Sequence, residues 1–154
     1  AYEQEQVRLI QRAPQKAWPY KEKADALDAF VRMVLQDAKV ANAEMRDFLY
    51  RDRIDLPVYA KALLGLALHR EGGQADKLKM VLQNIEQFVV EDAENQTAYL
   101  RLPAGSPWWH WYGSETEANA YYLKLLSAVS PKDTKAAGLV KYLLANRKHA
   151  TYWN

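Results

Sequence analysis

The sequence contains no cysteine, and this absence excludes several kinds of chemistry. Without a thiol there is no disulfide framework, no thiolate metal site and no cysteine nucleophile within these 154 residues. Long apolar runs are lacking too, since none approaches the roughly 20 residues that a helix needs to span a bilayer. We therefore expect no membrane span in the chain.

An excess of one charge is also lacking. The chain has 21 Lys and Arg against 19 Asp and Glu, and both signs are interspersed. A nucleic-acid binder usually carries a concentrated basic stripe, so we expect no nucleic-acid partner. Aromatic residues, by contrast, are plentiful, with five Trp and ten Tyr, which indicates a large core or a rich contact surface.

Residues that commonly carry catalysis or bind metals are scattered. His69, His110 and His149 are isolated and form no metal-binding spacing. Glu115 and Glu117 follow an aromatic run, but residues two apart on a helix do not face each other, which disfavours a glycosidase pair. No Gly-x-Ser-x-Gly, phosphate-binding or dinucleotide-binding motif occurs. We expect no catalytic residue, no metal and no cofactor, and we predict that the chain is not an enzyme.

Apolar residues recur with helical spacing through most of the chain. Residues 7–10 predict a short leading helix, which the prolines at 14 and 19 interrupt. The apolar stripe of Leu27, Phe30, Val31, Val34, Leu35 and Ala38 predicts a helix with this face in the core. Residues 45–49 predict a shorter partner helix.

In each of two later pairs of predicted helices, one helix is apolar on nearly all sides and the next is amphipathic. Residues 56–68 and 118–129 are apolar on nearly all sides, whereas residues 78–89 and 136–144 each carry a single apolar stripe. A helix that is apolar all round must be buried on all sides, and an amphipathic partner can cover it. The pairs lie roughly 60 residues apart, as in a weak repeat. This pattern predicts an all-α fold of α/α toroid-type helical hairpins, with an irregular helical bundle as the alternative.

Capping residues predict where these helices begin and end. Asp55 is expected to cap the helix that follows it, and Gly72-Gly73 to end that helix. Ser114 and Glu117 fit a capping box. Ser130-Pro131 is expected to open the final helix.

Residues 91–113 break the helical pattern. Ala98, Leu100 and Leu102 alternate with other residues at a period of two, and residues 103–107 are rich in turn formers. Trp108 to Tyr112 could return as a second strand. We predict a small β-hairpin insertion near residues 97–112.

The sharpest local signal is an aromatic cluster within this segment. Its members are Trp108, Trp109, His110, Trp111 and Tyr112. Such a cluster can fill the end of a helical barrel as core, contact a neighbouring domain or partner as an anchor, or stack on a sugar ligand. We take it as the candidate domain or partner contact of this chain.

Four tracts of the chain resemble the thioester-domain region of bacterial alpha-2-macroglobulin-like proteins. They are residues 55–68, 91–102, 108–126 and 139–154. The resemblance implies an α/α toroid of six hairpins, of which this chain would supply about half. In that family the last tract runs on into further helices, and this chain begins at Ala1 rather than at Met. We therefore expect residues 1–154 to form a single partial domain, a fragment of such a toroid.

The resemblance also implies a function. The family traps proteases through an internal thioester between a Cys thiol and a Gln in a Cys-x-Glu-Gln motif. Glu3-Gln4 and Glu5-Gln6 lack the required Cys, so the thioester would lie outside this chain or be absent. The expected role is a structural part of an endopeptidase inhibitor exported to the periplasm or cell surface. Its partners would be the other domains of the parent and, through the parent, target proteases.

Two other classes of function remain open. The first is a helical-repeat adaptor that binds a partner protein through the aromatic cluster. The second is an α/α-toroid enzyme that acts on glycans or prenyl substrates, although no Asp-rich motif appears. Because half a toroid would leave apolar surface uncovered, we also expect the fragment to self-associate or to rearrange into a compact bundle.

Overall fold

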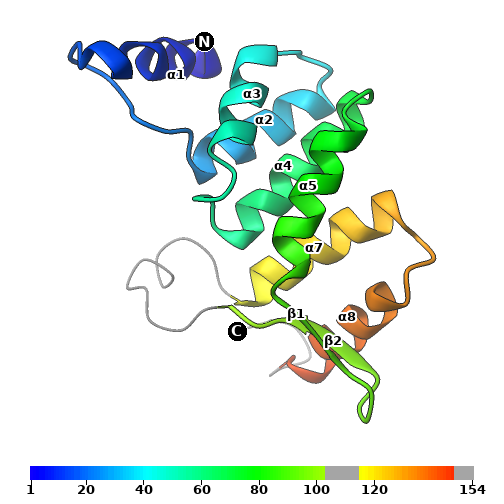
Figure 1. Ribbon diagram of the computed structural model, residues 1–154. Coiled ribbons are helices and arrows are strands. Elements are labelled where there is room, and N and C mark those ends of the chain that lie inside the picture. Colours follow the sequence, from blue (N-terminus) through cyan, green and yellow to red (C-terminus); the bar gives the residue numbers. More distant parts are fainter. Residues whose placement is uncertain (103–114, 148–154) are drawn as a thin grey trace.

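The computed structural model describes residues 1–102 and 115–147, and these residues are mostly helical. They form seven α-helices, one short 3₁₀ helix and one antiparallel two-stranded hairpin (Figure 1). The elements in chain order are α1 (Tyr2–Arg12), η1 (Ala13–Gln15), α2 (Ala26–Asp37), α3 (Ala43–Arg51), α4 (Val58–Glu71), α5 (Ala75–Glu86), β1 (Val89–Asp92), β2 (Thr97–Leu100), α7 (Glu115–Val129) and α8 (Thr134–Ala145). The predicted helical class and the presence of a small hairpin are confirmed. No helix of the described residues is long and apolar enough to cross a bilayer.

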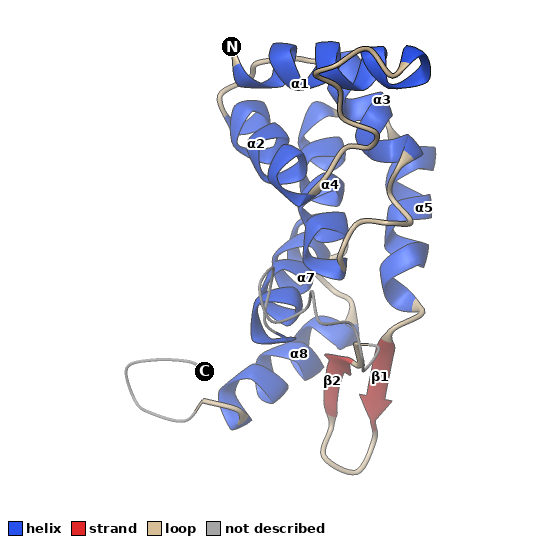
Figure 2. Ribbon diagram, turned by 90° about the vertical axis from the view of Figure 1, so that its left-hand side faces the viewer, coloured by secondary structure: helices blue, strands red, loops and turns tan. Residues whose placement is uncertain are grey.

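Helix α4 is the centre of the packing. It lies between α2 and α7 and also packs against α5 (Figures 1 and 2). Every residue from Ala60 to Leu68 is buried. This confirms the prediction that a helix apolar all round is surrounded on all sides. It ends at Gly72, whose φ of 74° is a conformation that glycine adopts without strain, as predicted.

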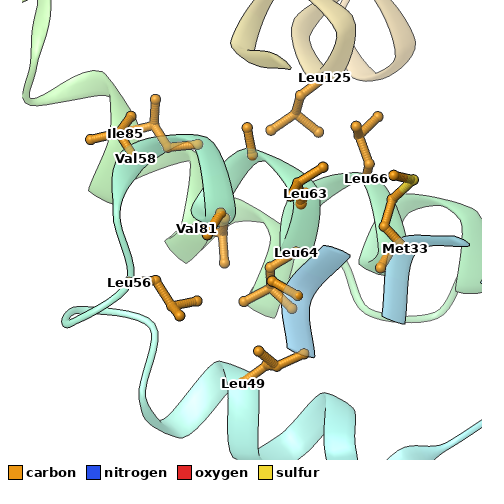
Figure 3. Close-up of a cluster of buried hydrophobic side chains, with 14 of the residues drawn as sticks. Met33, Leu49, Leu56, Val58, Leu63, Leu64, Leu66, Val81, Ile85 and Leu125 are labelled. Carbon is orange, nitrogen blue, oxygen red and sulfur yellow. The ribbon is translucent and has the colours of Figure 1, made fainter. Parts of the chain in front are cut away.

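The core gathers around α4 from four other helices (Figure 3). Helix α4 contributes Leu63, Leu64 and Leu66. The residues packed around them are Met33 from α2, Leu49 from α3, Val81 and Ile85 from α5, and Leu125 from α7. Gly65 lets α7 approach closely, because a Cβ atom there would lie 2.7 Å from Cδ2 of Leu125.

The hairpin pairs β2 with the segment that precedes it. The register runs from Val89 opposite Leu100 to Asp92 opposite Thr97. The prediction that Val89 belongs to the preceding helix is wrong, because α5 ends at Glu86. A short apolar run fits a strand as well as a helix, and pairing with β2 decides the outcome. The expected partner strand, Trp108 to Tyr112, lies outside the described residues.

Helix α8 packs directly on the hairpin. A Cβ atom at Gly138 would lie 2.7 Å from the backbone nitrogen of Ala98, so only glycine permits this contact. The buried side chain of Asn119 joins α7 to the same strand. Its oxygen accepts a hydrogen bond from the Leu100 N–H at 2.9 Å, and its amide donates to the Glu115 carbonyl at 2.8 Å.

Helix α2 buries a different face from the one predicted. The apolar residues Leu27, Phe30 and Val34 are 55%, 44% and 45% exposed. The buried residues of α2 are Asp28, Ala29, Arg32 and Met33. Burial of the two charged residues is possible because Lys21 pairs with Asp28 and Glu3 pairs with Arg32. Among the described residues, no element covers the stripe of Leu27, Phe30 and Val34.

Two predicted caps are also wrong. Asp55 does not cap α4, because Pro57 occupies the N-cap and Asp55 instead pairs with Lys23 at 2.5 Å. Helix α8 begins at Thr134 rather than after Ser130-Pro131, since the Asp133 side chain accepts from the Lys135 N–H at 2.9 Å. Ser114, of the expected capping box, lies outside the described residues.

Candidate functional site

An open, mainly apolar groove of about 970 Å³ crosses the N-terminal halves of α2, α4 and α7. Leu27 and Phe30 of α2 form one wall. Larger side chains in the rest of the apolar lining are Tyr59 and Leu63 of α4, Tyr121 of α7, Phe88 after α5, and Ile54 and Leu56 before α4. Three helices that are far apart in sequence thus contribute to one surface, and the exposed stripe of α2 borders it.

The rim of the groove carries carboxylates that are already paired. Asp25 bonds Lys21 at 2.7 Å, and Asp55 bonds Lys23 at 2.5 Å. The Asp25 carboxylate also caps α2 by accepting from the Leu27 and Asp28 N–H groups. Burial is the largest single influence on the pKa of Asp25, and it raises that pKa. The hydrogen bonds from the Lys21 side chain and from the backbone together outweigh burial, so the pKa is lowered. These carboxylates therefore act as structural acceptors rather than as free general bases.

Lys61 is the charged residue of α4 that lies within the groove lining and is itself buried, with 5% of its surface exposed. Its Nζ donates to the carbonyl oxygens of Leu56 at 2.5 Å and Ile54 at 3.0 Å. Burial lowers the pKa of this amine to about 8, and the charge of Asp55 opposes the shift. The side chain thereby ties the α3–α4 loop to α4 and shapes one end of the groove.

A second polar cluster attaches α1 to the body of the protein. The buried Arg32 guanidinium donates to Glu3 at 3.0 Å and also to the carbonyl of Val40. Nearby, Asp28 accepts from Lys21 at 2.6 Å and from the Tyr2 hydroxyl at 3.2 Å. Burial raises the pKa of Glu3 even though Arg32 opposes the shift. The visible effect of the cluster is to hold α1 in place.

The groove offers a mainly apolar binding surface. No group of three His, Asp or Glu side chains within residues 1–102 and 115–147 is placed to hold a metal ion. Glu115 accepts a hydrogen bond from the Tyr142 hydroxyl at 3.0 Å. Glu117 is one of the residues that line the groove. The groove can accept apolar side chains of a ligand, and the charged groups at its rim can orient that ligand.

The predicted contact residues Trp108, Trp109, His110, Trp111 and Tyr112 lie outside the described residues, as does His149. His69 lies in the last turn of α4. Sequence reasoning missed the groove itself, because it assigned Leu27 and Phe30 to the core. It also passed over Lys61, whose signal was present as a lone charge in an otherwise apolar stretch.

Comparison of the chain with family models, with curated proteins and with solved structures finds no match.

Proposed function

We propose that this chain is a structural part of a bacterial alpha-2-macroglobulin-like endopeptidase inhibitor, which acts as a protease trap. In this proposal residues 1–154 form one partial domain, about half of an α/α toroid. The thioester of the trap lies outside the chain or is absent, because the sequence has no cysteine. The chain contributes no catalytic residue, metal or cofactor of its own.

The observation that carries the proposal is the succession of helical pairs around α4. Helices α2, α4 and α7 pack side by side as inner helices would, and α3, α5 and α8 each follow one of them in the chain. Residues Ala60 to Leu68 of the middle helix are buried, whereas no described element covers the exposed Leu27, Phe30 and Val34 of α2. Uncovered apolar surface of this kind marks an interface, and in a complete ring a further hairpin would supply the cover.

The tracts that resemble the family support the same proposal. Residues 55–68 cover most of α4 and the turn before it, and residues 91–102 cover much of the hairpin. The partners of the chain would then be the other domains of the parent and, through the parent, the proteases it inhibits. The parent would act in the periplasm or at the cell surface.

The decisive experiment uses the parent protein. It is mixed with a broad-specificity protease, with and without methylamine pretreatment, and the products are separated under denaturing conditions. A covalent adduct that methylamine abolishes is the expected result for a thioester trap. If no adduct forms and the protease keeps its activity, the covalent-trap proposal is wrong.

A helical adaptor that binds a separate protein is the second candidate, because the groove is open and apolar. The two candidates differ in what covers α2 within the parent. A Leu27→Cys substitution places a thiol on the stripe, and maleimide labelling reports its accessibility. Protection in the folded parent favours the toroid, since a neighbouring hairpin would cover residue 27. Rapid labelling favours the adaptor.

A further inference from the structure

The connection between α1 and α2 contains a strained turn. Lys16 has φ 49° and ψ 33°, in the left-handed region that is unfavourable for a residue with a side chain. Residues 14–19 are all exposed, and Trp18 is 86% exposed. The connection leaves the far end of α1 and leads back along the molecule to α2 (Figure 1). Opening the turn therefore relieves strain and uncovers little apolar surface.

The site under α1 is too specialised to be left empty. The Arg32 guanidinium is 2% exposed and donates to Glu3 at 3.0 Å. A buried cation that loses its counter-charge is strongly unfavourable. Val7 and Ile10 of α1 are also buried, at 4% and 2% exposure. An opened turn thus requires another helix that supplies a carboxylate and two apolar residues at the same spacing.

A helix that meets this requirement is α1 of a second copy. It brings the same Glu3 to Arg32 and the same Gln11 to Glu44 of α3, a hydrogen bond of 2.8 Å within one chain. Because the two chains are identical, each contact that α1 makes within one copy can form between two. A free helix of 11 residues is marginal in water, so an undocked α1 is also unstable.

The connection is long enough for such an exchange. The Nζ of Lys21 pairs with Asp28 of α2 at 2.6 Å, so the connection rejoins the body of the protein at this residue. The Lys21 N–H donates to the Leu9 carbonyl at 3.1 Å, and its Nζ also donates to Gln6 at 3.1 Å. The eight residues 13–20 span roughly 26–29 Å when extended, more than the length of α1 at about 16 Å.

We propose that α1 is an exchangeable element: when the turn at Lys16 opens, α1 docks on α2 and α3 of a second copy, and the α1 of that copy docks in return. Strained hinge loops favour exchange of this kind, and the product is a symmetric dimer. The inference does not depend on the proposed function, because it concerns contacts that this chain already makes with itself.

The first test changes the turn alone. Lys16→Gly adopts the positive φ without strain and should favour the closed monomer. Lys16→Pro cannot adopt it and loses the N–H that donates to Ala13, so it should favour the exchanged dimer. Each chain is refolded from urea at about 1 mM, the effective concentration of a short flexible connection, and analysed by sedimentation velocity. The ratio of dimer to monomer should be at least about tenfold higher for Lys16→Pro than for Lys16→Gly.

A second residue with positive φ provides the matched control. Lys39 has φ 58° but lies after α2, so Lys39→Gly relieves similar strain without touching the connection and should dimerise like wild type. Circular dichroism verifies that all variants fold. If Lys16→Pro stays monomeric at about 1 mM, α1 does not exchange and the proposal is wrong.

Charge reversal gives the sharper result. Glu3→Arg and Arg32→Glu each place like charges in the buried contact, so neither chain alone can dock α1 in a closed or an exchanged form. In a mixed pair, the reversed α1 of one chain meets the reversed α2 of the other, and the two unchanged elements meet each other. The mixture should therefore form a 1:1 dimer at a concentration where wild type is monomeric, and the α1 amides should regain protection from hydrogen exchange.

Two controls define this result. Both substitutions in one chain should restore a docked α1 in a monomer, which verifies that the reversed pair fits. Glu5→Arg, at an exposed position of α1, should form no mixed dimer with Arg32→Glu. A mixture of Glu3→Arg and Arg32→Glu chains that stays monomeric, with α1 unprotected, overturns the proposal.

Discussion

At the scale of single residues, two glycines in helices set how closely neighbouring elements approach. At Gly138 the atoms that a Cβ would meet are backbone and Cβ atoms of β2, at 2.7 and 2.9 Å. At Gly65 the nearest atom is the end of the Leu125 side chain, at 2.7 Å. A side-chain end can shift by rotation, whereas the backbone of a paired strand cannot. The two positions therefore differ in how they tolerate a methyl group.

We predict that Gly138→Ala lowers the free energy of unfolding by about 1–3 kcal/mol, the usual cost of overpacking. The loss should appear even though alanine favours a helix over glycine by about 1 kcal/mol. Urea denaturation measures the change. Gly65→Ala is the matched control and should cost less. If Gly138→Ala is neutral or stabilising, the close contact between α8 and β2 does not exist.

Lys61 leads to a prediction about pH. Its pKa is about 8 in the folded protein against 10.5 for an ordinary lysine, mainly because the amine is buried. Between these two values the unfolded chain binds more protons than the folded one, so stability contributed by this group rises with pH. Below about pH 8 the amine is protonated in both states, and the contribution is constant.

The comparison of wild type with Lys61→Met isolates this effect. The stability difference between the two proteins should shift in favour of wild type from pH 8 to pH 10.5, by up to about 3 kcal/mol. Urea denaturation at several pH values gives the profile. Asp55→Asn should move the onset of the rise to lower pH, because the Asp55 charge raises the pKa of Lys61. A difference that does not change with pH would show that Lys61 is solvated in the folded protein.

At the scale of elements, α1 is held by a buried ion pair, by the hydrogen bond from Tyr2 to Asp28 and by a small apolar contact through Val7 and Ile10. The Glu3 and Arg32 side chains are 5% and 2% exposed. Removing one partner leaves an uncompensated buried charge, which costs about 3–5 kcal/mol, whereas replacing both with apolar residues is often neutral.

We predict that Glu3→Leu frees α1 and that the double substitution Glu3→Leu with Arg32→Met restores much of the loss. Hydrogen exchange of the α1 amides, followed by mass spectrometry, measures how firmly the helix is attached. Arg8→Leu, on an exposed position of the same helix, serves as a control and should leave exchange unchanged. Equal protection in the single and double variants would mean that the ion pair contributes no specific anchoring.

The same elements show what periodicity can and cannot predict. It located α4 and the burial of Ala60 to Leu68, because thirteen nearly all apolar residues leave no solvated face. It located α2 but chose the wrong face, since burial of Asp28 and Arg32 depends on Lys21 and Glu3, which lie on other segments. It extended α5 into β1, because the strand partner of Val89 is eleven residues away at Leu100. Local pattern thus fixes which residues share a face, and long-range pairing decides which face is buried.

At the scale of the whole molecule, α4 makes the parts of the chain interdependent. Leu64 is fully buried and lies in the cluster that α2, α3, α5 and α7 share. We predict that Leu64→Ala costs about 2–5 kcal/mol and lowers hydrogen-exchange protection in α2, α5 and α7 together. Met80→Ala, at an exposed position on α5, should stay within about 0.5 kcal/mol of wild type. Loss of protection confined to α4 and α5 would contradict a shared core.

The groove also belongs to this scale, which is why the sequence could not predict it. Leu27, Leu63 and Tyr121 come from three helices spread over almost a hundred residues. From the local sequence alone, each of these residues is predicted to be an ordinary core residue of its own helix. Only the side-by-side packing of α2, α4 and α7 brings them to the lining of one groove.

The position of α4 between an earlier and a later helix has a consequence for synthesis on the ribosome. Its cover on one side, α2, has already emerged when α4 appears, but α7 is completed about 60 residues later. At 5–20 residues per second, the nascent chain displays the α7-facing side of α4 for roughly 3–12 seconds. During that interval Leu63 and Leu66 are an exposed apolar site on an unfinished protein, so cotranslational chaperones have a defined segment to shield until α7 arrives.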